Sequence, residues 1–212
     1  MPTFFSKELS DRLYRFSVSL AAAGRLFTAD QLARHPDLSN RKEPVKRARE
    51  FLSKYPDTFE TLLSPSGVPA RRRLTKQARR KYGFDFRPVN GVSQRAEHWL
   101  GIGDIWLRLT FFGGRPEKWI TEPDKQFDVM CKWRGQILLI EYQRTPITSK
   151  VWASKWKKRR EWWISQKWNE KPIVILVDET RQDNKTISAP LGTAHVKSID
   201  EFPYALARRI QR

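Results

Sequence analysis

The sequence predicts an α+β chain in two parts: a helical part that ends in a β-hairpin, and an α/β part in which helices alternate with strands. Three observations support this. Apolar residues recur at helical spacing near the N-terminus, a turn signal formed by Pro88, Asn90 and Gly91 lies within residues 84–93, and all nine tryptophans follow that turn. We therefore expect two domains, residues 1–85 and 94–212.

The first helix is expected from about Lys7 to Ala23, because apolar residues occupy one helical face up to the stop signal at Gly24. Thr28 precedes the short segment "ADQLARH". A threonine side chain accepts hydrogen bonds from the first free N–H groups of a helix, so Thr28 is expected to cap a second helix.

A third helix is expected over "RKEPVKRAREFLSKY", residues 41–55, capped by Ser39 or Asn40. Pro44 falls in its first turn, where a missing N–H costs little. This helix would carry a strongly basic side. Its cations are Arg41, Lys42, Lys46, Arg47 and Arg49.

A hairpin and a further helix are expected next. "TFETLL" and "VPARRRLT" are joined by the turn "SPSG", and the return strand carries Arg71, Arg72 and Arg73. The order of helices and hairpin resembles a winged helix-turn-helix domain. That resemblance implies that the third helix enters the major groove while the arginine hairpin contacts the backbone or the minor groove. The alternative is that both are ordinary solvated surfaces.

The charge balance indicates a polyanionic partner. The chain has 41 Lys plus Arg against 23 Asp plus Glu, a net charge of +18 and a pI near 10.4. No long apolar run or clean amphipathic basic segment favours a membrane. The single cysteine, Cys131, excludes an internal disulfide framework and a cysteine-based zinc site. No secretory signal pattern begins the chain, so a cytoplasmic location is expected.

The second part is expected to form an α/β core. Residues 93–112 predict a helix that runs into a strand, and "TSKVWASKWKKRREWWISQKW" predicts a long helix capped by Thr148 or Ser149. "KPIVILVDE" predicts a buried strand, "TAHVKSI" another strand, and residues 200–212 a closing helix.

Between these elements, "FDVMCKWRGQILLIEYQR" predicts a hairpin with Arg134 and Gly135 as its two central turn residues. This register places Asp128 directly opposite Glu141. Like charges in that position repel, so a cation or a shared proton must offset them. With the Tyr142 carbonyl nearby, the two carboxylates would form an all-oxygen site suited to Mg²⁺ or Mn²⁺.

The same residues carry a resemblance to a known fold. The element order, with one acid at the start of the second strand and another near the end of the third, resembles the PD-(D/E)XK nucleases. "PDKQFD" supplies Asp124 or Asp128, and "EYQ" supplies Glu141, with Gln143 where the motif has lysine. Together with a winged domain, the layout looks most like the replication-relaxation family of plasmid, phage and mobile-element proteins.

The resemblance implies a DNA-binding protein of a bacterial or phage-infected cell, with a PD-(D/E)XK nuclease-like core that engages or cuts DNA. Asp128, Glu141 and Gln143 would be catalytic, with Asp128 and Glu141 holding the metal. The alternative is a non-catalytic regulator of replication, transfer or transcription with a degenerate core. A lower-ranked alternative is that the protein is an RNA-binding or assembly module. Expected partners are double-stranded DNA, single-stranded or nicked DNA, and a second copy of the chain.

Gln143 brings no positive charge, so Lys150 or Lys155 of the following helix is the candidate replacement. Glu97 and His98 are accessory candidates, although a solvated charge and a boundary histidine are the commoner outcomes. Asp178 and Glu179 are expected to begin a polar loop.

The tryptophan-rich helix has two interpretations. Trp152, Trp156 and Trp163 share a stripe that either stacks on bases of a single strand or packs on the sheet. Packing is the favoured interpretation. Its basic side remains a candidate phosphate contact through Lys155, Lys158 and Arg159.

Overall fold

The computed structural model describes residues 5–180, 194–204 and 206 of this mixed α+β chain. It divides into two compact units, residues 1–104 and 105–212. The division falls inside one long helix, α6 (Gln94–Gly113). The first half of α6 therefore belongs with the N-terminal unit, and the predicted linker around residues 86–93 lies within that unit.

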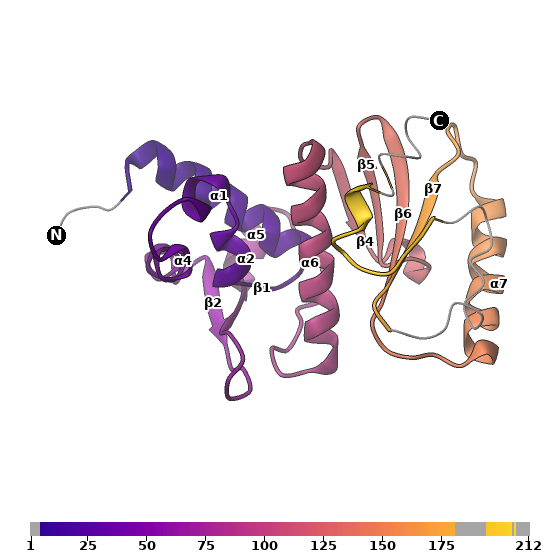
Figure 1. The fold of residues 1–212 in the computed structure, drawn as a ribbon, viewed down its shortest axis with the longest axis horizontal. Helices are drawn as coiled ribbons and strands as arrows, with labels where there is room; N and C mark the ends of the chain where they lie inside the picture. The colour runs from indigo at the N-terminus through magenta and orange to yellow at the C-terminus, as the bar shows by residue number, and fades with distance from the viewer. Residues whose placement is uncertain (1–4, 181–193, 205, 207–212) are drawn as a thin grey trace. The chain divides into compact units, whose positions relative to one another are not determined.

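The N-terminal unit combines short helices with a small antiparallel sheet (Figure 1). Its strands follow the spatial order β1-β3-β2, so β3 lies in the centre. In chain order the elements are α1 (Lys7–Ala23), β1 (Phe27–Thr28), α2 (Ala29–Ala33), α3 (Pro36–Ser39), α4 (Pro44–Leu52), β2 (Phe59–Leu62), β3 (Arg71–Leu74) and α5 (Lys76–Lys81).

The helix boundaries follow local capping chemistry. The predicted bounds of α1 are confirmed, with Gly24 at its C-terminal end. The Thr28 side chain accepts from the Gln31 N–H while Gln31 bonds back to Thr28, which forms a capping box. The predicted caps of the third helix were wrong. Ser39 ends the separate helix α3 and Asn40 is its C-cap, whereas α4 begins at Pro44 after Glu43 in a left-handed conformation.

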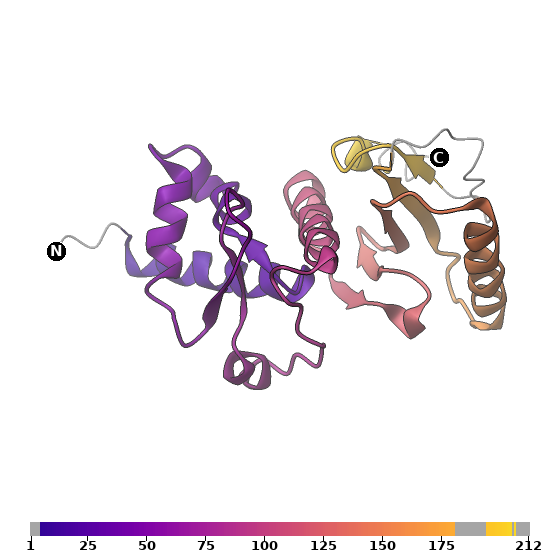
Figure 2. The same ribbon diagram turned by 90° about the horizontal axis from the view of Figure 1, so that it is seen from below.

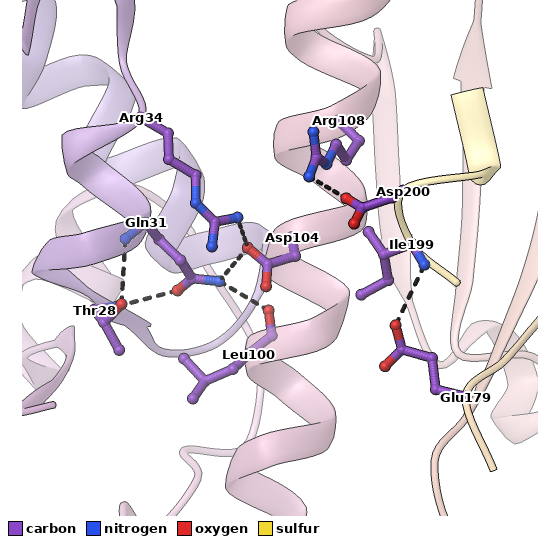
Figure 3. A network of polar contacts seen from close by, with 9 residues as sticks. All are labelled: Thr28, Gln31, Arg34, Leu100, Asp104, Arg108, Glu179, Ile199 and Asp200. Atoms are coloured by element: carbon purple, nitrogen blue, oxygen red, sulfur yellow. Dashed lines mark hydrogen bonds and ion pairs between the residues drawn. The ribbon is translucent and has the colours of Figure 1, made fainter. Parts of the chain in front are cut away.

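Within the N-terminal unit, the first half of α6 packs closely on the end of α1. A Cβ added at Gly24 would lie only 3.0 Å from the Gly103 Cα, so these two backbones meet without side chains between them. The Gln31 amide donates to the Leu100 carbonyl and to Asp104, and Arg34 pairs with Asp104 at 2.6 Å (Figure 3). Asp104 therefore has a structural role here.

The C-terminal unit is built on a five-stranded mixed sheet in the order β4-β5-β6-β7-β8. β4, β5 and β6 pair antiparallel, whereas β6, β7 and β8 pair parallel. Its elements are β4 (Lys118–Thr121), the 3-10 helix η1 (Pro123–Lys125), β5 (Val129–Trp133), β6 (Gln136–Gln143), α7 (Ser149–Ser165), β7 (Ile173–Asp178) and β8 (Ala194–Val196).

Two predictions for this unit were wrong. The segment 93–112 does not run into a strand, because residues 94–113 are helical throughout, and the first strand is β4, in a segment where no strand was predicted. The reason is burial on several sides of α6, where Trp106 and Leu107 are as buried as Ile105 and Leu109. A helix that is apolar all round has no clear period in its sequence. Of the predicted closing helix, residues 202–204 and 206 are helical, whereas Asp200 and Glu201 form a turn. Residues 205 and 207–212 lie outside the described residues, as does Thr193.

Helix α7 covers one face of the sheet (Figure 1 and Figure 2). Trp152 and Trp156 are each 3% exposed and pack against Leu139, Val174 and Leu176 of the strands. This confirms the packing interpretation for these two rings. At the edge of the same unit, Arg108 pairs with Asp200 and the Ile199 N–H donates to Glu179, as Figure 3 shows.

Candidate functional site

The β5–β6 hairpin has the predicted register. Its turn residues Arg134 and Gly135 both have positive φ, 49° and 79°, as a type I′ turn requires, and Trp133 pairs with Gln136. One residue before β5, the Asp128 N–H donates to the Ile140 carbonyl at 3.1 Å. The Asp128 carboxylate accepts the Tyr142 N–H at 2.8 Å. Asp128 and Glu141 therefore lie at the same end of the hairpin.

Two cations of α7 neutralise Glu141. The Glu141 side chain is 1% exposed; Lys155 donates to its Oε1 atom and Arg159 to its Oε2 atom. Lys155 and Arg159 are four residues apart, so they project from the same side of α7. The offsetting charge expected from the sequence is thus supplied by the protein's own side chains.

Arg159 is the centre of this buried cluster. It is 1% exposed, its Nε atom donates to the Gln126 carbonyl at 2.5 Å, and its guanidinium lies 4.8 Å from the Phe127 ring centroid and 5.0 Å from that of Trp156. Aromatic faces attract a cation, more strongly where water is excluded. Arg159 therefore joins α7, the segment before β5 and β6.

The electrostatics of Glu141 reflect competing influences. Burial raises the pKa of Glu141 above its ordinary value, and the nearby charge of Asp128 raises this pKa further. Arg159 and Lys155 act in the opposite direction and lower it. Glu141 thus depends on the two cations to carry a negative charge in a buried position.

Gln143 uses its side-chain nitrogen in a hydrogen bond outside this cluster. It is 8% exposed, and its amide donates to the Thr145 carbonyl at 2.5 Å, which holds the chain that leaves β6. Of the two lysines considered as replacements for the motif lysine, Lys155 reaches Glu141 and Lys150 is exposed.

The residues present do not fit a divalent ion in this arrangement. Both Glu141 oxygens already contact cations, and one Asp128 oxygen holds the Tyr142 N–H. Mg²⁺ and Mn²⁺ need several oxygen ligands that are free to coordinate. In the described part of the chain, no group of three or more His, Cys, Asp and Glu side chains is arranged to hold a metal.

The structure assigns other partners to the accessory candidates. Glu97 pairs with Arg71 within the N-terminal unit. The His98 ring meets the Trp99 ring edge-on at 5.6 Å. Asp124 accepts a hydrogen bond from the Trp162 indole at 2.8 Å. These interactions give all three residues structural roles.

Two of the residues predicted to contact nucleic acid are buried. Arg71 is 3% exposed, with its guanidinium bonded to Glu97 and to the Gly91 carbonyl. Arg159 is held by Glu141 as described above. Neither guanidinium can reach a phosphate without breaking its ion pair, and in the pair of Arg159 both side chains are buried.

The other two arginines of β3, Arg72 and Arg73, are half-buried. Arg73 donates to Glu60 at 2.7 Å and to the Val89 carbonyl at 2.9 Å. Arg72 is half-buried, and burial lowers its pKa from the ordinary value.

The predicted contacts on helices are more accessible. Arg41, Lys42, Lys46 and Lys158 are exposed, while Arg47 and Lys155 are half-buried. On α4 the apolar side consists of the buried residues Ala48, Phe51 and Leu52. The cations therefore lie on the side of α4 that faces solvent.

A second polar group lies at the ends of the parallel strands, where the sequence predicted that Asp178 and Glu179 begin a polar loop. Gln143 pairs in register with Asp178, and the Asp178 carboxylate accepts from Thr180 and lies 3.3 Å from the His195 Nε2 atom. Tyr142 donates to Glu179 at 2.6 Å. His195 was not among the predicted site residues, although its place in the predicted strand "TAHVKSI" was an available signal, because parallel strands end at the same sheet edge.

No described helix is long and apolar enough to cross a membrane. Comparison of the chain with models of known families, with curated proteins and with solved structures finds no match.

Proposed function

We propose that the chain is a DNA-binding protein in which the N-terminal unit is a winged helix-turn-helix domain that binds duplex DNA through α4. The C-terminal unit is then a nuclease-like core of the PD-(D/E)XK type that supports this binding. The proposal is for a regulator of replication, transfer or transcription of the replication-relaxation type, as found in plasmids, phages and mobile elements.

The element order of the N-terminal unit supports the winged-helix assignment. A helix and a short strand precede two packed helices, α2 and α4, and a β-hairpin follows them. The first strand joins the hairpin to give the order β1-β3-β2. In this arrangement the helix before the hairpin is the one that enters the major groove.

The observation that carries the proposal is the exposed basic side of α4. Lys46 and Arg49 are exposed and three residues apart on α4, so they project from one stripe opposite the buried apolar side, and Lys42 is exposed two residues before the helix begins. Lys46 pairs with Glu43 at 3.3 Å, and both side chains are more than half exposed. An exposed pair of this kind is weak, so a phosphate can replace it.

The hairpin contributes less charge than its sequence suggested. The segment between β2 and β3, residues 63–70, contains no charged residue, and Leu63 is 86% exposed there. The arginines lie on β3, where Arg71 and Arg73 are bonded within the unit. Phosphate neutralisation is therefore assigned to α4.

The C-terminal unit supports the nuclease-like part of the proposal through its topology. An antiparallel β4-β5-β6 meander is followed by α7 and the parallel strand β7, with Asp128 and Glu141 at one end of the hairpin. The neutralised state of Glu141 favours the regulator over a metal-dependent enzyme.

The test is duplex binding measured by fluorescence anisotropy at several salt concentrations. Lys46→Gln with Arg49→Gln, two exposed positions of α4, should weaken binding about tenfold at low salt and reduce the salt slope by about two, because two phosphate contacts are lost. Lys7→Gln with Arg15→Gln, two exposed positions of α1, is the charge-matched control. Equal losses in the two double variants would remove α4 as the contact surface.

A metal-dependent deoxyribonuclease is the second candidate. Lys155 brings to this site, from α7, the positive charge that Gln143 lacks, but an ion could bind only if Lys155 and Arg159 released Glu141. Supercoiled, linear and single-stranded DNA incubated with Mg²⁺ or Mn²⁺ would detect cleavage. Cleavage by the wild type that is lost in Asp128→Ala would establish the enzyme. If none of the three substrates is cleaved, the non-catalytic regulator is the better account.

A further inference from the structure

A pocket of about 400 Å³ opens on the C-terminal unit, at the opposite end of the β5–β6 hairpin from the Glu141 cluster. Its base is formed by β4, β5 and the start of β6. One wall is the segment just after α7. The lining residues are Lys118, Ile120, Met130, Cys131, Lys132, Ile137, Trp168, Asn169 and Glu170.

Two lysines face each other in this pocket. Lys118 on β4 pairs directly with Lys132 on β5, so their Cβ atoms point to the same sheet face about 4.5–5.5 Å apart. Like charges directly opposite destabilise an antiparallel pair. Of the residues that the structure describes, none pairs with either ammonium group. Glu141 has two cationic partners, whereas this like-charge pair has no ion-pair partner among the described residues.

Apolar side chains of the strands form the rest of the pocket base. Ile120 is 44% exposed although it lies on a strand, and Met130 and Ile137 beside it are half-buried. The Trp168 ring is held in place, because its indole N–H donates to the Trp163 carbonyl at 2.9 Å and its ring meets that of Trp162 at 5.7 Å. A fixed, partly exposed indole beside an apolar floor suits a planar ring.

From this geometry we propose that the pocket binds one unpaired nucleotide of a single-stranded segment of nucleic acid. The base stacks on Trp168 over the apolar floor, and the adjoining phosphate lies between Lys118 and Lys132. Asn169 offers an amide that both donates to and accepts from a base edge. Glu170 repels a phosphate at its side of the pocket and so favours the lysine side. The proposal deepens the function proposed above and rests on its nucleic-acid partner.

The charge part is tested with a fluorescently labelled 12-nucleotide oligo(dT) and a duplex of equal length. Lys118→Gln with Lys132→Gln should weaken binding of the single strand about tenfold and leave duplex binding close to that of the control. The control is Lys125→Gln with Lys197→Gln, which removes two exposed charges elsewhere in this unit. Equal effects of the two double variants on oligo(dT), or no binding of oligo(dT) by the wild type, would overturn the proposal.

The base part is tested with an abasic strand, which keeps the phosphates and lacks the rings. The wild type should bind it about tenfold more weakly than oligo(dT), since stacking is lost. Trp168→Leu should abolish that difference and Trp168→Phe should keep part of it. Equal binding of both strands by the wild type would refute the stacking contact.

Ile120→Glu separates binding from folding. Its carboxylate would lie beside Lys118 and Lys132, so thermal stability should be kept while oligo(dT) binding falls. Retained binding would contradict the pocket. If the pocket variants behave as expected but the α4 variants leave duplex binding unchanged, the function proposed for α4 is wrong and the pocket proposal is kept. If the α4 variants weaken duplex binding but the pocket variants leave oligo(dT) binding unchanged, only the pocket proposal is refuted.

Discussion

The β2–β3 and β5–β6 hairpins each carry charged residues for which the sequence predicted a function, and in the structure these residues form ion pairs. On the β2–β3 hairpin, the Arg71 side chain is 3% exposed, but its partner Glu97 is 43% exposed. On the β5–β6 hairpin, Glu141 and its partner Arg159 are at most 2% exposed. Water can replace the lost partner of Glu97 and cannot replace that of Glu141.

This difference shows that burial of the partner, rather than the presence of an ion pair, decides how much the fold depends on it. A charge that stays in contact with water keeps most of its hydration when its partner is removed. A charge that is buried on all sides has no water beside it to replace a lost partner. The two pairs should therefore respond very differently to the same kind of substitution.

The largest effect is expected for Arg159→Met, which leaves Glu141 buried with Lys155 alone. We expect the free energy of unfolding to fall by about 3–5 kcal/mol at pH 8, measured by urea denaturation. Arg159→Met combined with Glu141→Gln is the matched control, because it removes the buried acid as well and should recover most of the loss. A single variant within about 1 kcal/mol of wild type would contradict a structural role for the pair.

The same pair predicts a pH dependence with a definite sign. Since burial raises the pKa of Glu141, the folded state binds the carboxyl proton of Glu141 more tightly than the unfolded chain does. The stability that this proton contributes is fully present below pH 4.5, the ordinary pKa, and is lost as pH rises through the raised pKa of the folded state. Removing Arg159 takes away a group that lowers this pKa, so Arg159→Met should extend the loss to higher pH. The stability difference between wild type and variant should be small near pH 4 and grow above it. A difference that shrinks with rising pH would reverse the assignment.

A smaller effect is expected for Arg71→Met. Glu97 can turn to water, so the cost is mainly the hydrogen bond to the Gly91 carbonyl and should be about 1–3 kcal/mol. The salt slope of DNA binding should not change, because the Arg71 guanidinium does not reach a phosphate. A reduced slope in a folded variant would restore Arg71 as a contact.

The smallest effect is expected for Glu43→Gln at the start of α4. Its exposed pair with Lys46 should contribute less than about 1 kcal/mol to stability. Duplex affinity should rise slightly, because a negative charge beside the proposed phosphate contacts is removed. A fall in affinity would indicate that Glu43 itself contacts DNA.

Local rules were sufficient to predict several features. The capping residue Thr28, the bounds of α1 and the turn at Arg134 and Gly135 each depend on neighbours within a few residues, and the structure confirms all three. The turn also fixed the relation between Asp128 and Glu141, because register propagates along a hairpin.

The partners of these charges could not be predicted from local rules, because they lie far along the chain. Arg71 and Glu97 are 26 residues apart, and Arg159 and Glu141 are 18 apart. One signal was available for Arg159: it follows Trp152 and Trp156 at helical spacing and so lies on the stripe that packs against the sheet. A cation on a buried stripe implies a buried acid opposite it.

The position of Arg159 also has a kinetic consequence for the C-terminal unit. Its contacts reach the Gln126 carbonyl, 33 residues away, and Glu141, 18 residues away, so both need α7 to be docked on the assembled sheet. Contacts between distant segments require loop closure first, and those absent from the transition state act mainly on the unfolding rate. We therefore expect loss of this side chain to shorten the lifetime of the folded unit more than it slows its formation.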